Sequence, residues 1–371
     1  MYWDWLHQEP ASYQRSRGRP CRNPFARASA PLLDAGVDIE QFDGQAEPDR
    51  VRDCFRIVQA CYPVDQPHQP TWSLGAFTAK WVQGFDPSPH ESWIATDPAG
   101  EAAGCYLLTL PAQDNLSRAH VVLRVPPDRR RAGIGTALLR HCAGRARLAG
   151  RSWLAEQTWD GSAGAGFAAA VGASAGIADV HRTLLVDDEA RSRLPGLRRE
   201  AEARATGYSL LSWVGPTPED RLEQVAAVHA AMADAPRNAG VEPSVWDADR
   251  IRRLEKLTAE HGVGSYTVVA RHDASDRLAA ITQIVTDPGA PGWGIQQLTA
   301  VLQQHRGHRL GLLVKVAMLE LLGSAAPDVG RIVTDNAGSN EHMIAINAQL
   351  GFEVSGVTRS WQLDLTGLGA S

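Results

Sequence analysis

The sequence predicts an α/β protein made of two tandem domains, each with a mixed central sheet flanked by helices. A strand-like apolar run, a loop of arginine and glycine, and an amphipathic run with helical spacing follow one another at residues 121–142. The same succession returns at residues 295–322, with arginine and glycine at matching positions, so an internal duplication is expected. A length of 371 residues is long for one hydrophobic core and comfortable for two.

In each half, a strand, two amphipathic helices and a pair of strands are expected before the loop. In the first half the strand pair encloses Asp97-Pro98-Ala99-Gly100, a composition typical of a tight turn. The expected elements are strand 37–42, helices 48–61 and 74–85, strands 92–96, 102–110 and 121–125, and a helix from 137. Another strand, a short helix and a last strand should follow.

The second half repeats this order with clearer helix boundaries. Thr217-Pro218-Glu219-Asp220 combines an N-cap residue, a proline at the first helical position and acidic residues in the first turn. His261-Gly262 is a typical helix end. The expected elements are strand 208–214, a helix from 217, helix 247–260, strands 265–271, 278–286 and 295–302, and helix 312–322.

A charged stretch with helical propensity separates the halves, so we place the domain boundary there. The expected division is a leader at 1–35, an N-terminal domain at 36–187, a helical linker at 188–206 and a C-terminal domain at 207–366. The leader is rich in arginine and proline and has no acidic residue from position 10 to 33, which predicts a disordered basic segment.

Composition narrows the class of protein. An apolar fraction of 44% with a net charge of only -5 predicts a folded globular protein and argues against nucleic acid as the main partner. No apolar run reaches membrane-spanning length and no secretory segment opens the chain, so no membrane partner is expected. The five cysteines form no Cys-x-x-Cys pair, which favours reduced thiols in the cytoplasm over disulfides or a metal site.

The first loop has the chemistry of an anion site. Glycines let the backbone approach an anion closely, the start of the following helix adds partial positive charge, and Arg130 and Arg131 add fixed charge. The loop is not a Walker A loop, because no Gly-Lys-Ser/Thr follows, and it lacks the Gly-x-Gly-x-x-Gly of dinucleotide-binding folds. The alternative is a basic turn that caps an ordinary helix.

The pattern Arg130-x-x-Gly133-x-Gly135 resembles the pyrophosphate-binding signature of the GNAT N-acetyltransferases, Arg/Gln-x-x-Gly-x-Gly/Ala. The second loop aligns Arg306 and Gly311 with this pattern but has Arg309 at the first glycine. Arginine there either binds a phosphate with its side chain or prevents close backbone approach. The C-terminal stretch 336–352, which ends in Gly-Phe, resembles the closing part of the same fold. The chain is therefore similar to actinobacterial tandem GNAT proteins, the group that includes mycothiol synthase.

The resemblance implies that an acetyl group passes from acetyl-CoA to a primary amine of a small molecule by direct attack. It assigns coenzyme A binding to Leu123, Val125, Arg130, Arg131, Ala132, Gly133, Ile134, Gly135, Thr136, Thr299, Val301, Arg306, Gly307, His308, Arg309, Leu310, Gly311, Asn336 and Asn340. Asn340 is equally well explained as an ordinary helix N-cap. No metal is implied, and the protein is expected to be a monomer or homodimer.

The catalytic base is less clear from the sequence. An alkylamine has a pKa of roughly 10, so a base should help it lose a proton. His120 is one candidate, although a lone histidine on a strand is more often structural, and Asp335 is another, acting through water. Counted from the loop, Gln296 takes the place of His120 in the second domain. Asn347 stands where family members often have a tyrosine acid. The regular first loop favours the first domain for cofactor binding.

Two other hypotheses compete with the acetyltransferase. One is an acyl-CoA-binding pseudoenzyme or regulatory module without turnover, which the missing carboxylates and tyrosine favour. The other is a structural tandem repeat without a ligand, which leaves the two matching loops unexplained.

Overall fold

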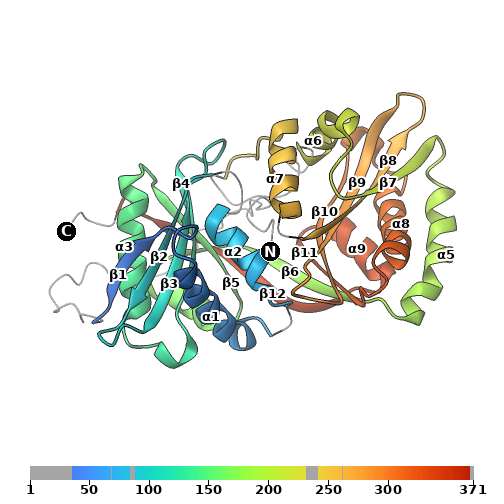
Figure 1. The fold of residues 1–371 in the computed structure, drawn as a ribbon. Helices are drawn as coiled ribbons and strands as arrows, with labels where there is room; N and C mark the ends of the chain where they lie inside the picture. Colours follow the sequence, from blue (N-terminus) through green and yellow to red (C-terminus); the bar gives the residue numbers. More distant parts are fainter. Residues whose placement is uncertain (1–35, 68, 84–87, 231–240, 261, 368–371) are drawn as a thin grey trace, which may run out of the picture. The chain divides into compact units, whose positions relative to one another are not determined.

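The computed structural model describes residues 36–67, 69–83, 88–230, 241–260 and 262–367. The leader predicted at 1–35 lies outside the described residues. Contacts divide the described chain into two compact units that are interleaved along the sequence (Figure 1). We call them the N-terminal unit, mainly residues 36–178 and 357–367, and the C-terminal unit, mainly residues 179–230 and 243–356.

The sheet of the N-terminal unit has the strand order β1-β2-β3-β4-β5-β12. Only β4 and β5 pair in parallel, and the other neighbours are antiparallel. The strands are β1 (Asp38–Phe42), β2 (His90–Thr96), β3 (Ala102–Thr109), β4 (Arg118–Arg124), β5 (Trp153–Trp159) and β12 (Glu353–Asp364). Parallel neighbours need a crossover, and helix α3 (Ile134–Leu148) provides it.

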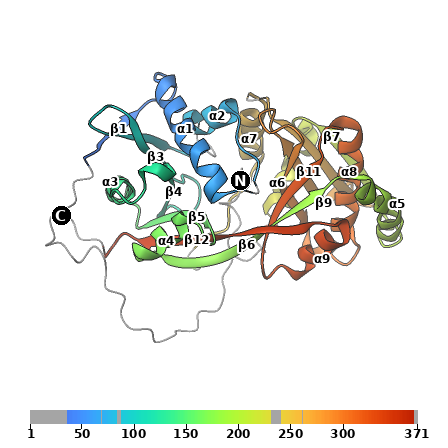
Figure 2. The ribbon, with the colours of Figure 1, turned by 90° about the horizontal axis from the view of Figure 1, so that it is seen from below.

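Helices cover both faces of this sheet. On one face, α1 (Pro48–Asp65) and α2 (Leu74–Gln83) bury a cluster that includes Phe77 and Trp81, whose rings stack 4.4 Å apart. On the other face, α3 packs Leu138 and its neighbours against alternate residues of β4 such as Val121. The short helix α4 (Ala163–Ala170) lies beside β5 (Figure 2).

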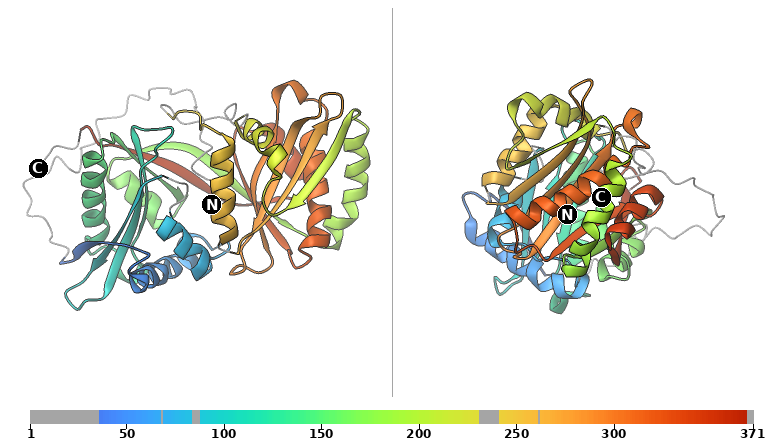
Figure 3. Two further views of the ribbon diagram at one scale, coloured as in Figure 1. Left: turned by 45° about the horizontal axis from the view of Figure 1, so that its top comes forward. Right: turned by 90° about the vertical axis from the view of Figure 1, so that its right-hand side faces the viewer.

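The C-terminal unit repeats this plan with the strand order β6-β11-β10-β9-β8-β7. Its parallel pair is β10 and β11. The strands are β6 (Ser174–Leu185), β7 (Tyr208–Val214), β8 (Gly264–His272), β9 (Arg277–Thr286), β10 (Trp293–Val301) and β11 (Arg331–Ala337). Helices α6 (Leu222–Ala230) and α7 (Ala248–Glu260) cover one face. Helices α5 (Asp188–Glu202), α8 (Leu310–Ala325) and α9 (Glu341–Leu350) cover the other (Figure 3).

Strands β6 and β12 explain why the units are interleaved. Residues 179–185 of β6 pair with β11, and residues 358–364 of β12 pair with β5. The last strand of each repeat therefore completes the sheet that contains the other repeat's strands. The sequence instead predicts consecutive domains at 36–187 and 207–366, because pairing over such separations leaves no local signal.

The predicted α/β class, with mixed sheets flanked by helices and a duplicated element order, is confirmed. Some boundaries were wrong. Helix α1 continues past 61 to Asp65, and β4 begins at Arg118. The helix expected from 217 starts as a 3₁₀ turn at 219–221, because Pro218 rather than Thr217 holds the N-cap position and has no oxygen side chain to offer. Within the described ranges, none of the helices combines the length and apolar character of a membrane span.

Candidate functional site

The two arginine-glycine loops share one backbone conformation. Each follows a 3₁₀ turn, and each then places an arginine in an extended conformation: Arg130 at φ -72° and ψ 160°, and Arg306 at φ -70° and ψ 158°. Each loop then has two positions with positive φ. The first loop fills them with arginine and then glycine, and the second with glycine and then arginine. The residues are Arg131 (φ 68°) and Gly133 (φ 87°), then Gly307 (φ 88°) and Arg309 (φ 55°). The arginine at 309 therefore does not alter the loop's path.

This path leaves a run of backbone N–H groups pointing outward. After Arg130, the next backbone N–H groups of the first loop with a hydrogen bond are those of Thr136 and Ala137, which both donate to the carbonyl of Gly133. In the second loop, Leu313 donates to the carbonyl of Arg309. Among the described residues, no acceptor takes the N–H groups of 131–135 or 307–311. Alternating backbone handedness with free N–H groups at a helix start is the geometry of an anion site.

In each loop, one arginine side chain is engaged by a carboxylate of the protein. In the first loop Arg130 donates Nε to the carbonyl of Val125 at 3.0 Å and grips both carboxylate oxygens of Asp65, at 3.0 and 2.6 Å. This ion pair keeps the pKa of Arg130 above its ordinary value despite its burial. Arg309 pairs with Glu200 at 2.8 Å. These two guanidinium groups are therefore engaged within the protein, whereas the backbone N–H groups, the helix ends and the exposed Arg131 remain to attract an anion.

The second glycine of each loop has a packing reason. A Cβ at Gly135 would contact Phe167 of α4 at 3.7 Å and Val125 at 3.8 Å. A Cβ at Gly311 would meet Ile346 of α9 at 3.1 Å and Val301 at 3.7 Å. In both units the start of the long helix thus lies against the following short helix and the end of the preceding strand.

The parallel strands of each unit pair at one end and then separate. Strands β4 and β5 pair from Arg118 opposite Trp153 to His120 opposite Ala155. Strands β10 and β11 likewise pair over three residues, ending at Ile295 opposite Val333. Beyond these points the ends of β4 and β10 turn backbone groups toward the gap. The predicted residues Leu123, Thr299 and Val301 lie on these ends, and Val125 follows directly after β4.

Strand β10 contains an irregularity that β4 lacks. Its register with β9 shifts between Gln296 and Leu298, whereas β4 pairs with β3 without a shift. A bulge adds one residue to a strand and leaves it unpaired. The residue of the second unit that corresponds to His120 therefore depends on the reference point. Gln296 has the same distance along the chain to the loop arginine, whereas Ile295 has the same place in the parallel strand pairing.

In the N-terminal unit, side chains fill the gap beside β4. The N–H of Leu123 donates to Glu156 at 3.1 Å, and the carbonyl of Leu123 accepts from Arg124 at 2.8 Å. Arg124 and Glu156 also pair with each other at 3.0 Å, with side chains 19% and 17% exposed. Burial raises the pKa of Glu156 while Arg124 opposes the rise. Both polar groups of Leu123 are thus already occupied.

The corresponding edge of β10 is uncovered. Leu302 donates its N–H to Ala279 of β9, so by alternation Thr299 and Val301 turn theirs away from β9. The carbonyl of Val301 accepts a hydrogen bond from Nε of Arg306 at 3.3 Å, and the carbonyl of Val125 accepts the equivalent bond from Arg130. No side chain of the described residues bonds to the backbone of Thr299, whose hydroxyl contacts that of Thr282.

The remaining predicted residues take varied positions. Asn340 caps α9 by accepting the N–H of Met343 at 3.2 Å, the ordinary role left open above. Asn336 accepts a hydrogen bond from the buried Asn347 of α9 at 2.6 Å. Asp335 therefore lies on the opposite face of β11. His120 lies on the face of β4 that α1 and α2 cover.

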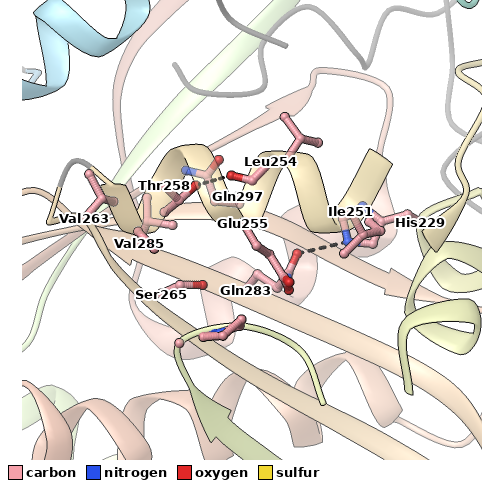
Figure 4. A pocket seen from close by; sticks show the side chains of 13 residues that line it. His229, Ile251, Leu254, Glu255, Thr258, Val263, Ser265, Gln283, Val285 and Gln297 are labelled. Carbon is pink, nitrogen blue, oxygen red and sulfur yellow. Dashed lines mark hydrogen bonds between the residues drawn. The ribbon is translucent and has the colours of Figure 1, made fainter. Parts of the chain in front are cut away.

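A cavity of about 70 Å³ lies in the C-terminal unit between α6, α7 and the sheet (Figure 4). Its apolar lining includes Ile251, Leu254, Val263 and Val285, and its polar lining includes His229, Glu255, Ser265, Gln283 and Gln297. No motif in the sequence predicts this site. The available signal was a glutamine on each of two otherwise apolar strands and a histidine on an apolar helix.

The polar groups of the cavity form an ordered chain. His229 Nε2 lies 3.0 Å from Gln283 Oε1, and Gln283 Nε2 donates to Thr267 at 3.3 Å. The contact between His229 and Gln283 orients the imidazole ring at the wall of the cavity. Gln297, beside the bulge, has a buried Oε1 without a hydrogen bond among the described residues. Within the same part of the chain, no cluster of His, Cys, Asp and Glu is arranged to hold a metal ion.

Comparisons with known proteins agree with this geometry. Residues 51–164 match the family model of the acetyltransferase (GNAT) family. A solved tandem GNAT protein from the clavulanic acid biosynthesis pathway is 27% identical, with a TM-score of 0.74 over 90% of this chain and 99% of that one. No curated protein sequence matches.

Two more distant structures show the fold alone. A GCN5-related N-acetyltransferase from Sphaerobacter thermophilus is 14% identical, with a TM-score of 0.60 over 90% of this chain and 96% of that one. A glucosamine N-acetyltransferase region of a fungal β-N-acetylglucosaminidase is 13% identical, with a TM-score of 0.59 over 88% of this chain and 38% of that one. Similarity to mycothiol synthase in particular stays a prediction.

Proposed function

Because the chain belongs to the GNAT superfamily of acetyltransferases, we propose that it transfers the acetyl group of acetyl-CoA to a primary amine of a small molecule. One observation carries the proposal. In the C-terminal unit, β10 pairs with β11 over only three residues, so the described residues leave its end exposed as an edge. This edge leads to a loop whose N–H groups have no acceptor among the described residues and could bind an anion. The same unit contains the cavity that an acceptor requires.

The residues present fit coenzyme A. The N–H groups of 307–311 would hold its pyrophosphate, since a helix start favours anions. The backbone of Thr299 and Val301 would pair with the amides of its pantetheine arm, as an edge strand pairs with an added strand. When bound, coenzyme A supplies an acetyl group activated as a thioester. The unpaired backbone at the bulge of β10 offers an N–H group for the carbonyl oxygen of that thioester.

The cavity would receive the amine. Its lining combines apolar side chains with several polar groups, which suits a small molecule that carries both. Glu255 accepts the N–H of Thr217 at 2.8 Å and pairs with Arg252 at 3.0 Å, so its charge is balanced within the protein. We assign the base to His229, which lines the cavity and would accept the amine's proton directly or through one water. Neither His120 nor Asp335 lines this cavity.

The test is transfer itself, measured as thiol release from acetyl-CoA with a panel of small primary amines. His308 is exposed in the second loop, with its ring 5.3 Å from that of Tyr208, so His308→Glu places a carboxylate beside the N–H groups at the surface. We expect kcat/KM for acetyl-CoA to fall by at least roughly tenfold. Gln304→Glu adds the same charge on the exposed turn before the loop and serves as the control.

A binding module without turnover is the second candidate, favoured by Asn347, which bonds to Asn336 at the position where family members often have a tyrosine acid. It predicts tight binding of acetyl-CoA with no thiol release from any amine in the panel.

A further inference from the structure

We propose that the Arg124–Glu156 pair is a latch that closes the N-terminal unit to the pantetheine arm. The first loop then binds only the nucleotide-phosphate end of coenzyme A, whatever acyl group the molecule carries. This inference rests on the proposed function, because it takes coenzyme A as the ligand. It assigns the N-terminal unit a ligand class rather than a reaction: a nucleoside diphosphate with no demand on the thioester.

The evidence for the latch is a set of contacts at one residue. A pantetheine arm that pairs with β4 needs both the N–H and the carbonyl of Leu123. Glu156 accepts the N–H at 3.1 Å, and Arg124 donates to the carbonyl at 2.8 Å. Because the two side chains also bond to each other, neither leaves without exposing the other's charge.

The internal repeat provides a comparison within the same chain. By the strand registers, Thr334 stands in β11 where Glu156 stands in β5. By the loop spacing, Ala300 stands in β10 where Arg124 stands in β4. Neither residue can form an ion pair, and the backbone of Thr299 bonds to no side chain of the described residues. The same fold thus has an open edge in one unit and a closed edge in the other.

The phosphate end of the N-terminal site is unaffected by the latch. The N–H groups of 131–135 have no acceptor among the described residues, and the loop follows the same path as its partner. Arg130 is neutralised by Asp65, so the loop offers its N–H groups and the exposed Arg131 to the phosphates. Such a site distinguishes ligands by their phosphates and not by their acyl chains.

The experiment uses the full chain with His308→Glu, which weakens phosphate binding at the second loop. Calorimetric titrations compare acetyl-CoA, free coenzyme A and 3′-phospho-ADP, the fragment without the arm. With the latch intact we expect the three dissociation constants to agree within about threefold, because only the phosphates bind. Adding Arg124→Met with Glu156→Leu removes both charges at similar volume, and acetyl-CoA should then bind at least roughly tenfold more tightly than 3′-phospho-ADP.

A control changes another, partly buried Glu–Arg pair of this unit. Glu91 and Arg145 form an ion pair at 2.7 Å on the face that α3 covers. Glu91→Leu with Arg145→Met should therefore leave the dissociation constants of the three ligands equal. The proposal is overturned if acetyl-CoA already exceeds 3′-phospho-ADP tenfold with the latch intact, if the latch variant gains nothing, or if no ligand binds in the His308→Glu protein. Loss of transfer in the unmodified chain would instead contradict the proposed function, so the two failures are distinguishable.

Discussion

Arg309 occupies in the second loop the position that Gly133 occupies in the first, and both adopt a left-handed backbone conformation, at φ 55° and 87°. A side chain in this conformation is strained by roughly 1 kcal/mol. Arg309 also turns its guanidinium to Glu200 of α5. The pairing answers the question that the sequence left open, because the arginine neither distorts the loop nor points its charge at the helix start.

Arg309→Gly should therefore change the affinity for acetyl-CoA by less than about threefold, because backbone N–H groups rather than the guanidinium hold the phosphates. Titration of the variant measures this directly. Arg306→Gly, at the extended position of the same loop, is the comparison, because it removes the bond to Val301 that anchors the turn. A tenfold loss with Arg309→Gly would make the Arg309 side chain a phosphate ligand.

His229→Gln should lower kcat about 100-fold with little change in KM for acetyl-CoA, because a glutamine cannot take the amine's proton. The loss should shrink as the pH rises toward the amine's own pKa of roughly 10, where the free base needs no help. A pH profile of kcat for the variant and the unmodified protein checks this. A loss that stays constant with pH would reduce His229 to a packing role beside Trp246.

Lys315 is a second buried titratable group, 3% exposed on α8, with its Nζ 5.0 Å from the ring centre of Phe352. No carboxylate of the described residues forms an ion pair with it, and burial lowers its pKa from 10.5 to about 7. Between those values the unfolded chain binds more protons than the folded one. The free energy of unfolding should therefore rise with pH from about 7 to 10.5.

Lys315→Met should remove this dependence and stabilise the protein at pH 7 by up to about 5 kcal/mol. Its advantage should fade as the pH rises through 10.5, above which the unmodified lysine is neutral in both states. Denaturant unfolding at several pH values measures the difference, with the exposed Lys256→Met as the control. Equal stability profiles for Lys315→Met and the unmodified protein would contradict the buried neutral amine.

Two glycines beside helix α3 should respond to alanine in opposite directions. A Cβ at Gly104 would lie 2.8 Å from Leu138 and 3.2 Å from the carbonyl of Arg124, so Gly104→Ala should lower the free energy of unfolding by about 1–3 kcal/mol. A Cβ at Gly144, inside the helix, meets nothing within 4 Å, so Gly144→Ala should raise it by up to about 1 kcal/mol. Thermal or denaturant unfolding tests both, and equal effects would deny that α3 packs closely on β3.

The sequence predicts what is local. Arg130 and Gly133 indicate a strand-loop-helix unit within a few residues, and the second copy of this pattern predicts the duplication. The Arg124–Glu156 pair joins residues from two strands that separate after His120, and no spacing marks where a parallel pair parts. The sequence also does not predict that β6 pairs with β11 and β12 with β5, because pairing between distant segments depends on the whole sheet.

The residues of the cavity were also not predictable from local patterns in the sequence. His229 was visible only as a helical position, and Gln283 only as a polar residue in a strand. Their hydrogen bond requires α6 to be packed on β9, which the periodicity of either element does not specify. Asn340 is the converse case, because the local N-cap pattern explained it fully.

The most direct test of the account compares two equivalent substitutions, Ala132→Glu in the first loop and His308→Glu in the second, for the rate of acetyl transfer to a small amine. Both side chains are exposed, and each carboxylate would lie at the same place beside the N–H groups of its loop. The account predicts that His308→Glu reduces kcat/KM for acetyl-CoA at least roughly tenfold more than Ala132→Glu does. The opposite order would place transfer in the N-terminal unit and contradict the latch and the open β10 edge together.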